Sequence, residues 1–227
     1  KVKESPVFVE AAAKRAQAAK PEMSPAMTLF TKFPKQLLLV AGANICHFST
    51  FYLFTVFSMS YAKRDLGMSN SLVLAVVMLA ICTHLVVVPL AGALSDRIGR
   101  RRMMLIGFAV TALSAFPFWT LYSSGEFMPM LAGASLLMIS YGLVYGAVAS
   151  FTGEAFSTGV RFTGFAMATN VGGIVGGGTA PIIGAFLLSY FGTPYAIAWY
   201  MVFLALVSAA CTYFSKETSN KDISIES

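Results

Sequence analysis

The chain has 227 residues, of which 57% are hydrophobic and only 11% charged, with a formal net charge of +6. A soluble domain of this length with a mean hydropathy of +0.72 could not cover its surface with polar groups. Uncharged runs of about 20 residues, enough to cross a bilayer, recur along the chain. Composition therefore predicts an all-α, multi-pass membrane protein and disfavours a β-barrel, whose strands alternate in polarity.

The first 35 residues are polar and basic and contain four prolines. We expect residues 1–35 to be a cytoplasmic segment on or near the membrane surface, the alternative being a flexible linker with one short helix. A six-helix transmembrane bundle is predicted over 36–214, followed by a cytoplasmic tail over 215–227, with a kink at Pro181 in the fifth span. The predicted spans are 37–61, 71–94, 103–122, 128–152, 162–191 and 194–214.

The distribution of Lys and Arg predicts the orientation of these spans. If both termini are cytoplasmic, that side holds seven basic residues in the N-terminal segment and seven further along the chain. The opposite side then holds only Lys63 and Arg64. Basic residues collect on the cytoplasmic side of membrane proteins, so the positive charge does not indicate a nucleic-acid partner. The two trios of spans, 37–122 and 128–214, would form the 3+3 inverted repeat of many secondary transporters.

A charged turn, Gly92-Ala93-Leu94-Ser95-Asp96-Arg97-Ile98-Gly99-Arg100-Arg101-Arg102, separates the second and third spans. Its two glycines allow a sharp turn and close helix approach, and its aspartate can accept hydrogen bonds from an arginine or a helix N-terminus. We expect a cytoplasmic network that latches one conformation of a carrier. Its members would be Asp96, Arg97, Arg100, Glu154 and Arg161. The alternative is a solvated turn whose arginines only set the topology.

The predicted spans contain no Lys, Arg, Asp or Glu, so His47 and His84 are their candidate titratable groups. The first-choice lining of a substrate cavity is one face of the first span, with Asn44 and His47 as donors to an anionic substrate. Interhelical hydrogen bonding without ligand contact is the alternative for these groups, and is expected for His84. The complete set of cavity candidates is Asn44, His47, Phe51, Tyr141, Tyr145 and Asn170.

The glycine run 172–178 lacks the Lys-Ser/Thr of a phosphate-binding loop and any preceding strand. Gly173 and Gly177 lie four residues apart, with Pro181 next on the same face, which predicts close helix packing or gating. The three cysteines lack metal-site spacing. We therefore expect no nucleotide, no other cofactor and no metal.

The charged turn resembles the signature G-x-L-[S/A]-D-[R/K]-x-G-[R/K]-[R/K] of the major facilitator superfamily, matching at Gly92, Leu94, Ser95, Asp96, Arg97, Gly99, Arg100 and Arg101. Three further stretches resemble its metabolite:proton symporter branch, which includes shikimate, α-ketoglutarate, proline/betaine and dicarboxylate carriers. They are 4–8, 154–164 and 176–181, and their order corresponds to the central loop and the tenth and eleventh helices of such a carrier. The resemblance implies the C-terminal six-helix half only, because the second copy of the motif is missing.

The leading hypothesis is a proton-coupled symporter of a small organic acid or related metabolite, in the bacterial inner membrane, working by alternating access. Its partner would be the missing N-terminal six-helix bundle, which is also expected to carry the main proton-coupling carboxylate. The alternative is a receptor or regulatory subunit that retains the carrier fold without transporting. An enzyme is disfavoured because the spans contain no carboxylate pair, metal-ligand cluster or activated nucleophile.

Overall fold

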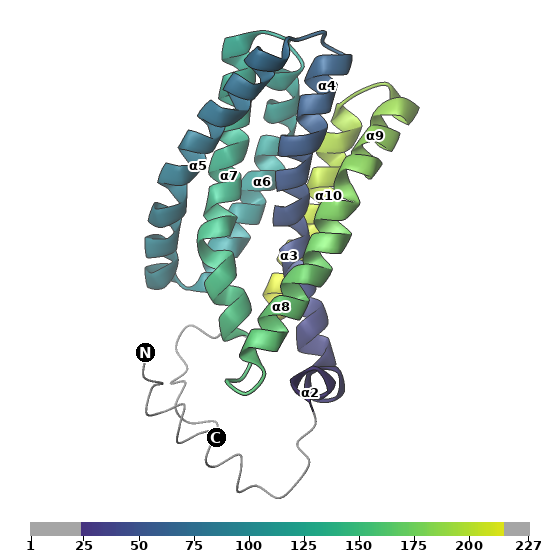
Figure 1. Ribbon diagram of the computed structural model, residues 1–227. Helices are drawn as coiled ribbons and strands as arrows, with labels where there is room; N and C mark the ends of the chain where they lie inside the picture. The colour runs from purple at the N-terminus through teal and green to yellow at the C-terminus, as the bar shows by residue number, and fades with distance from the viewer. Residues whose placement is uncertain (1–23, 216–227) are drawn as a thin grey trace, which may run out of the picture.

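The computed structural model describes residues 24–215, whose regular elements are all helical. The expectations for residues 1–23, including the stretch 4–8, and for the tail after Ser215 lie outside the described residues. A short helix, α2 (Pro25–Lys32), begins at Ser24, whose hydroxyl accepts a hydrogen bond from the Met27 amide at 3.3 Å. Leu29 is fully buried and anchors α2 to the bundle. Figure 1 shows α2 end-on, across the end of the upright spans.

Within residues 24–215, six helices are long and apolar enough to cross a membrane, as the sequence predicts. Charged and polar turn residues end these helices. Several of the helices extend a few residues beyond the uncharged runs from which the spans were predicted. The spans are Pro34–Arg64 (α3, Pro34–Tyr52; η1, Leu53–Phe57; α4, Ser58–Arg64), Asn70–Ile98 (α5), Arg100–Tyr122 (α6), Phe127–Glu154 (α7), Arg161–Phe191 (α8, Arg161–Gly172; η2, Gly173–Gly178; α9, Ala180–Phe191) and Tyr195–Phe214 (α10).

The spans form two layers (Figure 1). In the front layer α5, α7, α3–α4 and α8–α9 stand in that order, while α6 and α10 lie behind them. α6 packs along α7 and α10, and α10 also packs on α3, so the rear pair holds the front layer together. Trp119 of α6 is fully buried between the layers, with its ring 5.8 Å from those of Phe57 and Tyr61. The predicted all-α six-helix bundle is confirmed.

Two spans of the front layer contain a segment of π-helix. The sequence predicts a kink at Pro181, but the helix changes earlier, at η2, and Pro181 lies at the start of the new α-helix α9. The second segment, η1 in the first span, was not predicted. Each π turn shifts the register of the helix by one residue, and such turns are frequent at functional sites.

The glycine run packs the α8–η2 region against α3, closely at Gly177 as predicted but not at Gly173, and also at two glycines that were not predicted. A Cβ added at Gly176 would lie only 2.3 Å from the Ile45 carbonyl oxygen, and one at Gly172 would lie 2.6 Å from the Asn44 Cβ. Gly177 is also close, at 2.7 Å from the Tyr52 ring, whereas Gly173 makes ordinary contact with Phe48. The π turn rotates the helix, so the closest contacts are made at 172 and 176. Ser49 also donates a hydrogen bond to the Gly176 carbonyl at 2.9 Å.

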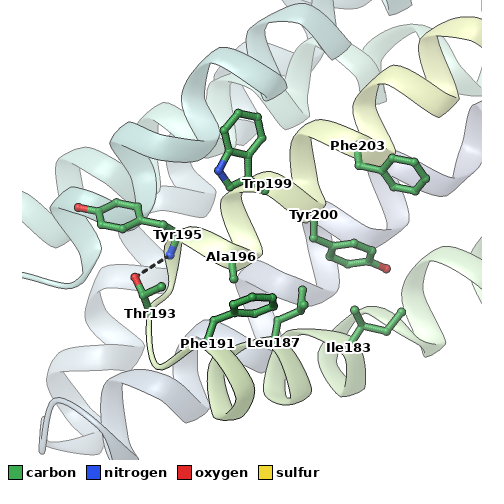
Figure 2. Close-up of a pocket in the computed structure, with 9 residues that line it drawn as sticks. All are labelled: Ile183, Leu187, Phe191, Thr193, Tyr195, Ala196, Trp199, Tyr200 and Phe203. Carbon is green, nitrogen blue, oxygen red and sulfur yellow. Dashed lines mark hydrogen bonds between the residues drawn. The ribbon is translucent and has the colours of Figure 1, made fainter.

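An apolar groove separates α9 from α10 (Figure 2). It begins at the turn between these helices, where Gly192 ends α9 in the left-handed conformation. That turn lies at the end of the bundle opposite to the α5–α6 turn.

Candidate functional site

Two histidines and three aromatic side chains from α3, α5 and α7 meet near the middle of their spans. Four ring pairs define this cluster, which we call the histidine–tyrosine cluster: His47–Tyr141 (6.3 Å), His84–Tyr141 (4.8 Å), Tyr141–Tyr145 (5.6 Å) and Phe51–Tyr141 (5.7 Å, stacked). Tyr141 is therefore its centre. Tyr145 completes it by facing both histidines, at 6.4 Å from His47 and 5.4 Å from His84.

The cluster has a buried side and an open side. His47 and Tyr141 are 4% and 6% exposed, whereas Phe51 and Tyr145 are 36% and 46% exposed. The exposed members give the cluster access to the surface of the described bundle, and the buried members form its floor. The structure thus brings together four of the six cavity residues that the sequence predicts.

Each histidine has one buried ring nitrogen without a hydrogen bond of normal geometry, although the rings interact with the backbone of Asn44 and Met138 respectively. The Nδ1 atoms of His47 and His84 are buried and have no hydrogen-bond partner within residues 24–215. Most buried polar groups in proteins are paired, so two unpaired ring nitrogens beside one tyrosine pair mark a place for a ligand or water. A neutral imidazole offers one donor and one acceptor, and each tyrosine hydroxyl offers both. The cluster can therefore bind a polar ligand without carrying a fixed charge.

A close crossing of α5 and α7 explains how His84 reaches Tyr141. A Cβ at Gly146 would lie 2.7 Å from the Val88 carbonyl oxygen, and one at Gly142 would lie 2.8 Å from Val87 Cγ1 and 3.3 Å from His84 Nδ1. Only residues without side chains let the two backbones approach this closely, as at other transmembrane helix crossings. Gly142 and Gly146 thus bring His84 beside Tyr141, and its ring also interacts with the Met138 backbone of α7, in line with the expected interhelical bond.

Asn44 and Asn170, the other two cavity candidates, have different surroundings. Asn44 is 2% exposed, and its amide donates to the Val40 carbonyl at 2.8 Å and to the Thr152 hydroxyl at 3.2 Å. It therefore joins α3 to α7. Asn170 is exposed and donates to the Ala166 carbonyl of its own helix at 2.8 Å. Within the described residues, neither side-chain amide bonds to a ring of the cluster, so Asn44 shares a helix with His47 but not its neighbours.

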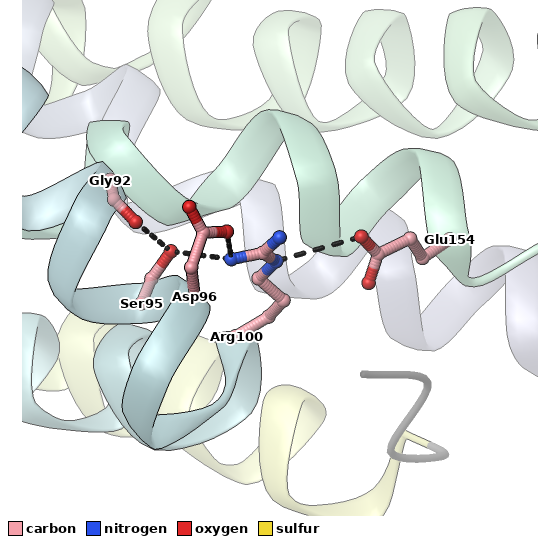
Figure 3. A network of polar contacts seen from close by, with 5 residues as sticks. All are labelled: Gly92, Ser95, Asp96, Arg100 and Glu154. Atoms are coloured by element: carbon pink, nitrogen blue, oxygen red, sulfur yellow. Dashed lines mark hydrogen bonds and ion pairs between the residues drawn. The ribbon is translucent and has the colours of Figure 1, made fainter. Parts of the chain in front are cut away.

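A second polar group lies at the α5–α6 turn (Figure 3). Gly99, the single residue between these helices, has φ +98°, a conformation that favours glycine. The turn sets Arg100 beside the last turn of α5, where its guanidinium pairs with Asp96 and donates to the Ser95 hydroxyl at 3.0 Å. The Ser95 hydroxyl in turn donates a hydrogen bond to the Gly92 carbonyl at 2.8 Å.

The same arginine reaches the end of α7. Arg100 Nε lies 3.5 Å from Glu154 Oε1, and the two side chains are 18% and 29% exposed. Arg100 thus ties the α5–α6 turn to the start of the α7–α8 loop, as Figure 3 shows. We call Asp96, Arg100 and Glu154 the Arg100 network.

Arg97, Arg101 and Arg161, which the sequence places near the gating motif, lie outside this network. Arg161 donates to the Phe156 carbonyl at 3.3 Å, inside the loop that follows α7. Arg101 donates to the Tyr213 carbonyl and lies 4.7 Å above that tyrosine ring, so it binds the end of α10. Arg97 makes no hydrogen bond or ion pair with residues 24–215. Of the five expected members, the structure brings together three.

Sequence reasoning missed two participants, Thr152 as partner of Asn44 and Ser95 in the Arg100 network. It named His84 for an interhelical bond but did not predict that its ring lies beside Tyr141. The pair Gly142 and Gly146, four residues apart in the fourth span, was the available signal for His84. The partners of Ser95 and Thr152 depend on helix rotation, and no local pattern indicates them.

Comparison with known proteins agrees with this geometry. Residues 39–226 match the family model of the Major Facilitator Superfamily. The chain is 34% identical to the inner membrane metabolite transport protein YhjE of Escherichia coli (strain K12), over 97% of this chain and 50% of the relative. It is 28% identical to the shikimate transporter of the same organism, over 89% and 47% of the two chains. It is 30% identical to the citrate-proton symporter of Klebsiella pneumoniae, over 78% and 40%.

The chain belongs to the Major Facilitator Superfamily. It has six helices apolar enough for a multi-pass membrane protein, and the expected family is confirmed; the relatives that it matches are named as transporters and not as enzymes. The chain spans about half the length of these curated relatives. Its six-helix bundle is consistent with the C-terminal half of the family fold.

Proposed function

We propose that this chain is the C-terminal bundle of a carrier that moves a small organic acid or related metabolite together with a proton by alternating access. The histidine–tyrosine cluster carries the proposal. It lies at mid-span, where carriers of this architecture bind their substrates between two bundles. It offers unused ring nitrogens and hydroxyls to a polar ligand and opens to the surface of the described bundle.

The names of the relatives support the substrate class and the coupling. One is called a citrate-proton symporter and another a shikimate transporter, and both names denote organic acids. Other relatives are named proline/betaine transporters, so a zwitterionic metabolite is the second candidate substrate. By residue type, His47 and His84 are the candidate proton-exchanging groups of the described spans, which contain no Lys, Arg, Asp or Glu within their uncharged runs. A carboxylate on the partner bundle would supply the rest of the coupling.

The Arg100 network would act as a gate on the cytoplasmic side. The proposed orientation, with both termini in the cytoplasm, rests on the fourteen basic residues that it places there against two opposite. An arginine held between an exposed carboxylate on one helix and a partly buried carboxylate on another forms a contact that can be made in one state and broken in another. Arg97 and Arg161 then remain available for the partner bundle or for lipid headgroups.

Uptake by the full-length protein in liposomes tests the proposal. With an imposed inward proton gradient, labelled shikimate or citrate should accumulate, and a protonophore should abolish the accumulation. His47→Ala should raise the substrate concentration for half-maximal uptake about tenfold, corresponding to about 1.4 kcal/mol. Tyr141→Phe should raise it less, because only the hydroxyl is lost, and Tyr190→Phe, on an exposed tyrosine of α9, should have no effect.

Three outcomes would each remove one part of the proposal. Uptake that ignores the proton gradient would remove the coupling. Accumulation of proline without organic acids would replace the substrate class. Wild-type affinity in His47→Ala would remove His47 from the binding site.

A further inference from the structure

The π segment η2 packs on the helix that also carries His47 and Phe51 of the histidine–tyrosine cluster. α3 lies between the two, with His47 and Phe51 directed to the cluster and Phe48 and Tyr52 directed to η2. Four of the six residues of η2 are glycines, which allow close packing but leave the backbone free to adopt other conformations. The π register of η2 therefore needs support from contacts outside the segment.

One carbonyl of η2 lacks the partner that a regular π-helix would give it. A π-type hydrogen bond joins a carbonyl to the amide five residues further on, and for Gly176 that residue is Pro181, which has no amide hydrogen. The Gly176 carbonyl accepts instead from the Thr179 amide and from the Ser49 hydroxyl, which lies 2.9 Å away. Ser49 is 1% exposed, so a bond shielded from water joins α3 to η2.

The Ser49 hydroxyl has a second acceptor within reach. Its oxygen also lies 2.9 Å from the Ile45 carbonyl of its own helix, and a hydroxyl has a single hydrogen to donate. Ser49 can therefore release Gly176 without becoming a buried unpaired donor. The Tyr200 hydroxyl of α10 interacts with Ser49 and with Thr179 at the end of η2, so a third helix supports the contact.

η2 also packs on two aromatic rings of α3. A Cβ added at Gly177 would lie 2.7 Å from the Tyr52 ring, and one at Gly173 would lie 3.6 Å from the Phe48 ring. The two glycines lie four residues apart, so the positions of both rings depend on the register of the segment between them.

The same two rings touch members of the histidine–tyrosine cluster. The Phe48 ring lies 4.2 Å from that of His47, and the Tyr52 ring lies edge-on to that of Phe51 at 5.6 Å. His47 and Phe51 in turn face Tyr141, the centre of the cluster. An unbroken series of contacts thus leads from the Gly176 carbonyl to the candidate substrate site.

We propose that Ser49 is a positioning residue for the candidate substrate site. Its hydroxyl holds η2 in the π register, and η2 in turn sets the rings of Phe48 and Tyr52. Those rings determine how His47 and Phe51 face the substrate. This inference rests on the proposed function only where it names the cluster as the substrate site, because the contacts themselves hold without substrate.

Two rates measured on the full-length protein in nanodiscs, without substrate, test the proposal. Ser49→Ala should raise the hydrogen–deuterium exchange rate of the backbone amides 173–180 about fivefold, within the range for loss of one hydrogen bond between transmembrane helices. It should also raise the rate at which diethyl pyrocarbonate acylates His47. Mass spectrometry of the digested protein measures both rates.

Ser114→Ala is the control for this variant. Ser114 is also buried, and its hydroxyl lies near an acceptor in its own helix and near Ser140 of α7, but it makes no bond to η2. The control should leave both rates at the wild-type values.

A milder variant keeps the test independent of the folding of Ser49→Ala. Tyr200→Phe removes only the hydroxyl that supports Ser49 and should raise both rates in the same direction, by a smaller factor. Tyr195→Phe, on the same helix, removes a hydroxyl that contacts Thr120 of α6 and should change neither rate. Only variants that elute as the wild type are compared.

The aromatic step has its own matched pair. Phe48→Ala should raise the acylation rate of His47, whereas Phe116→Ala should not, because Phe116 is a partly buried phenylalanine that packs on Trp199. In uptake assays Ser49→Ala and Phe48→Ala should each raise the half-saturating substrate concentration about fivefold and leave the maximal rate near wild type. General destabilisation would lower the maximal rate instead.

Three results would overturn the proposal. They are wild-type amide exchange in Ser49→Ala, wild-type acylation of His47 in Ser49→Ala, and equal changes in Ser49→Ala and Ser114→Ala. If His47→Ala keeps wild-type substrate affinity, the proposed substrate site fails, but the exchange and acylation rates still decide whether Ser49 holds η2 and positions His47.

Discussion

The ring of His84 on α5 lies 4.8 Å from the ring of Tyr141 on α7, although the two residues are far apart in the chain. This contact depends on the glycine crossing between the helices, which brings Gly142 within 3.3 Å of His84 Nδ1, measured from an added Cβ. A histidine that the sequence assigned to helix packing thus becomes a member of the candidate substrate site.

Replacing His84 should weaken substrate binding. His84→Ala removes an unpaired ring nitrogen from the cluster, and we expect the half-saturating substrate concentration to rise about tenfold, or about 1.4 kcal/mol. Cys82→Ala, at an exposed position two residues earlier on α5, is the matched control and should behave as wild type. Uptake kinetics in liposomes measure both. Unchanged substrate affinity in His84→Ala would show that His84 does not bind substrate and only supports helix packing.

Replacing Asn44 should lower stability and leave affinity unchanged. Asn44→Ala removes the hydrogen bond from α3 to Thr152 on α7, and such bonds contribute about 0.6–1.7 kcal/mol in membrane proteins. A thermal unfolding scan in detergent should show a lower midpoint, while substrate affinity stays at the wild-type value. A large loss of affinity without loss of stability would instead place Asn44 in the cavity.

Adding a side chain at Gly146 should separate α5 from α7. A Cβ there would meet the Val88 carbonyl oxygen, the Ala91 Cβ and the Gly92 amide nitrogen, all within 2.8 Å. We expect Gly146→Val to cost about 1–3 kcal/mol of stability, the range for overpacked cores, and to reduce substrate binding through His84. Gly178→Ala, where nothing lies within 4 Å of an added Cβ, is the control. Equal unfolding midpoints for the two variants would contradict the close crossing.

Removing the charge of Arg100 should loosen the proposed cytoplasmic gate. Arg100→Gln breaks the partly buried pair with Glu154 as well as the exposed pair with Asp96. For groups with this exposure we expect about 1 kcal/mol, or roughly a fivefold change in the ratio of closed to open states. The rate of thiol labelling at a cysteine introduced at Ser157, in the α7–α8 loop, reports this ratio.

Arg102→Gln serves as the control for the gate, because Arg102 is exposed and adjoins the same helix terminus. It removes the same charge without removing a contact of the Arg100 network. Equal labelling rates in the two variants would contradict the gate and would indicate that the arginines of the turn only set the orientation of the spans.

The sequence was most informative where a single property of the chain decides the outcome. The lengths of the uncharged runs and the charged turns between them predicted six spans, and the motif in the turn between Gly92 and Arg102 predicted the family. The site was predicted less completely. Helical spacing placed His47 and Phe51 together, as well as Tyr141 and Tyr145, because neighbours on one helix face depend only on the helical repeat.

Contacts between helices were less predictable for a physical reason. Spacing shows which residues share a face, but it does not show which neighbour that face meets. Asn44 follows the same spacing as His47, yet it turns to Thr152 rather than to the tyrosines. The π turn at Gly173–Gly178 then changes the register of α8–α9, which moved the closest packing from Gly173 to Gly172 and Gly176.

The sequence by itself determined the membrane class, the six spans and the family, because these follow from hydrophobic length, charge and local motif. Tertiary structure decided that His84 joins Tyr141, that Arg100 rather than Arg97 links α5 to α7, and that an apolar groove opens between α9 and α10. These relationships depend on helix rotation and crossing distance. Both are set by where glycines let backbones meet, and that depends on two helices at once.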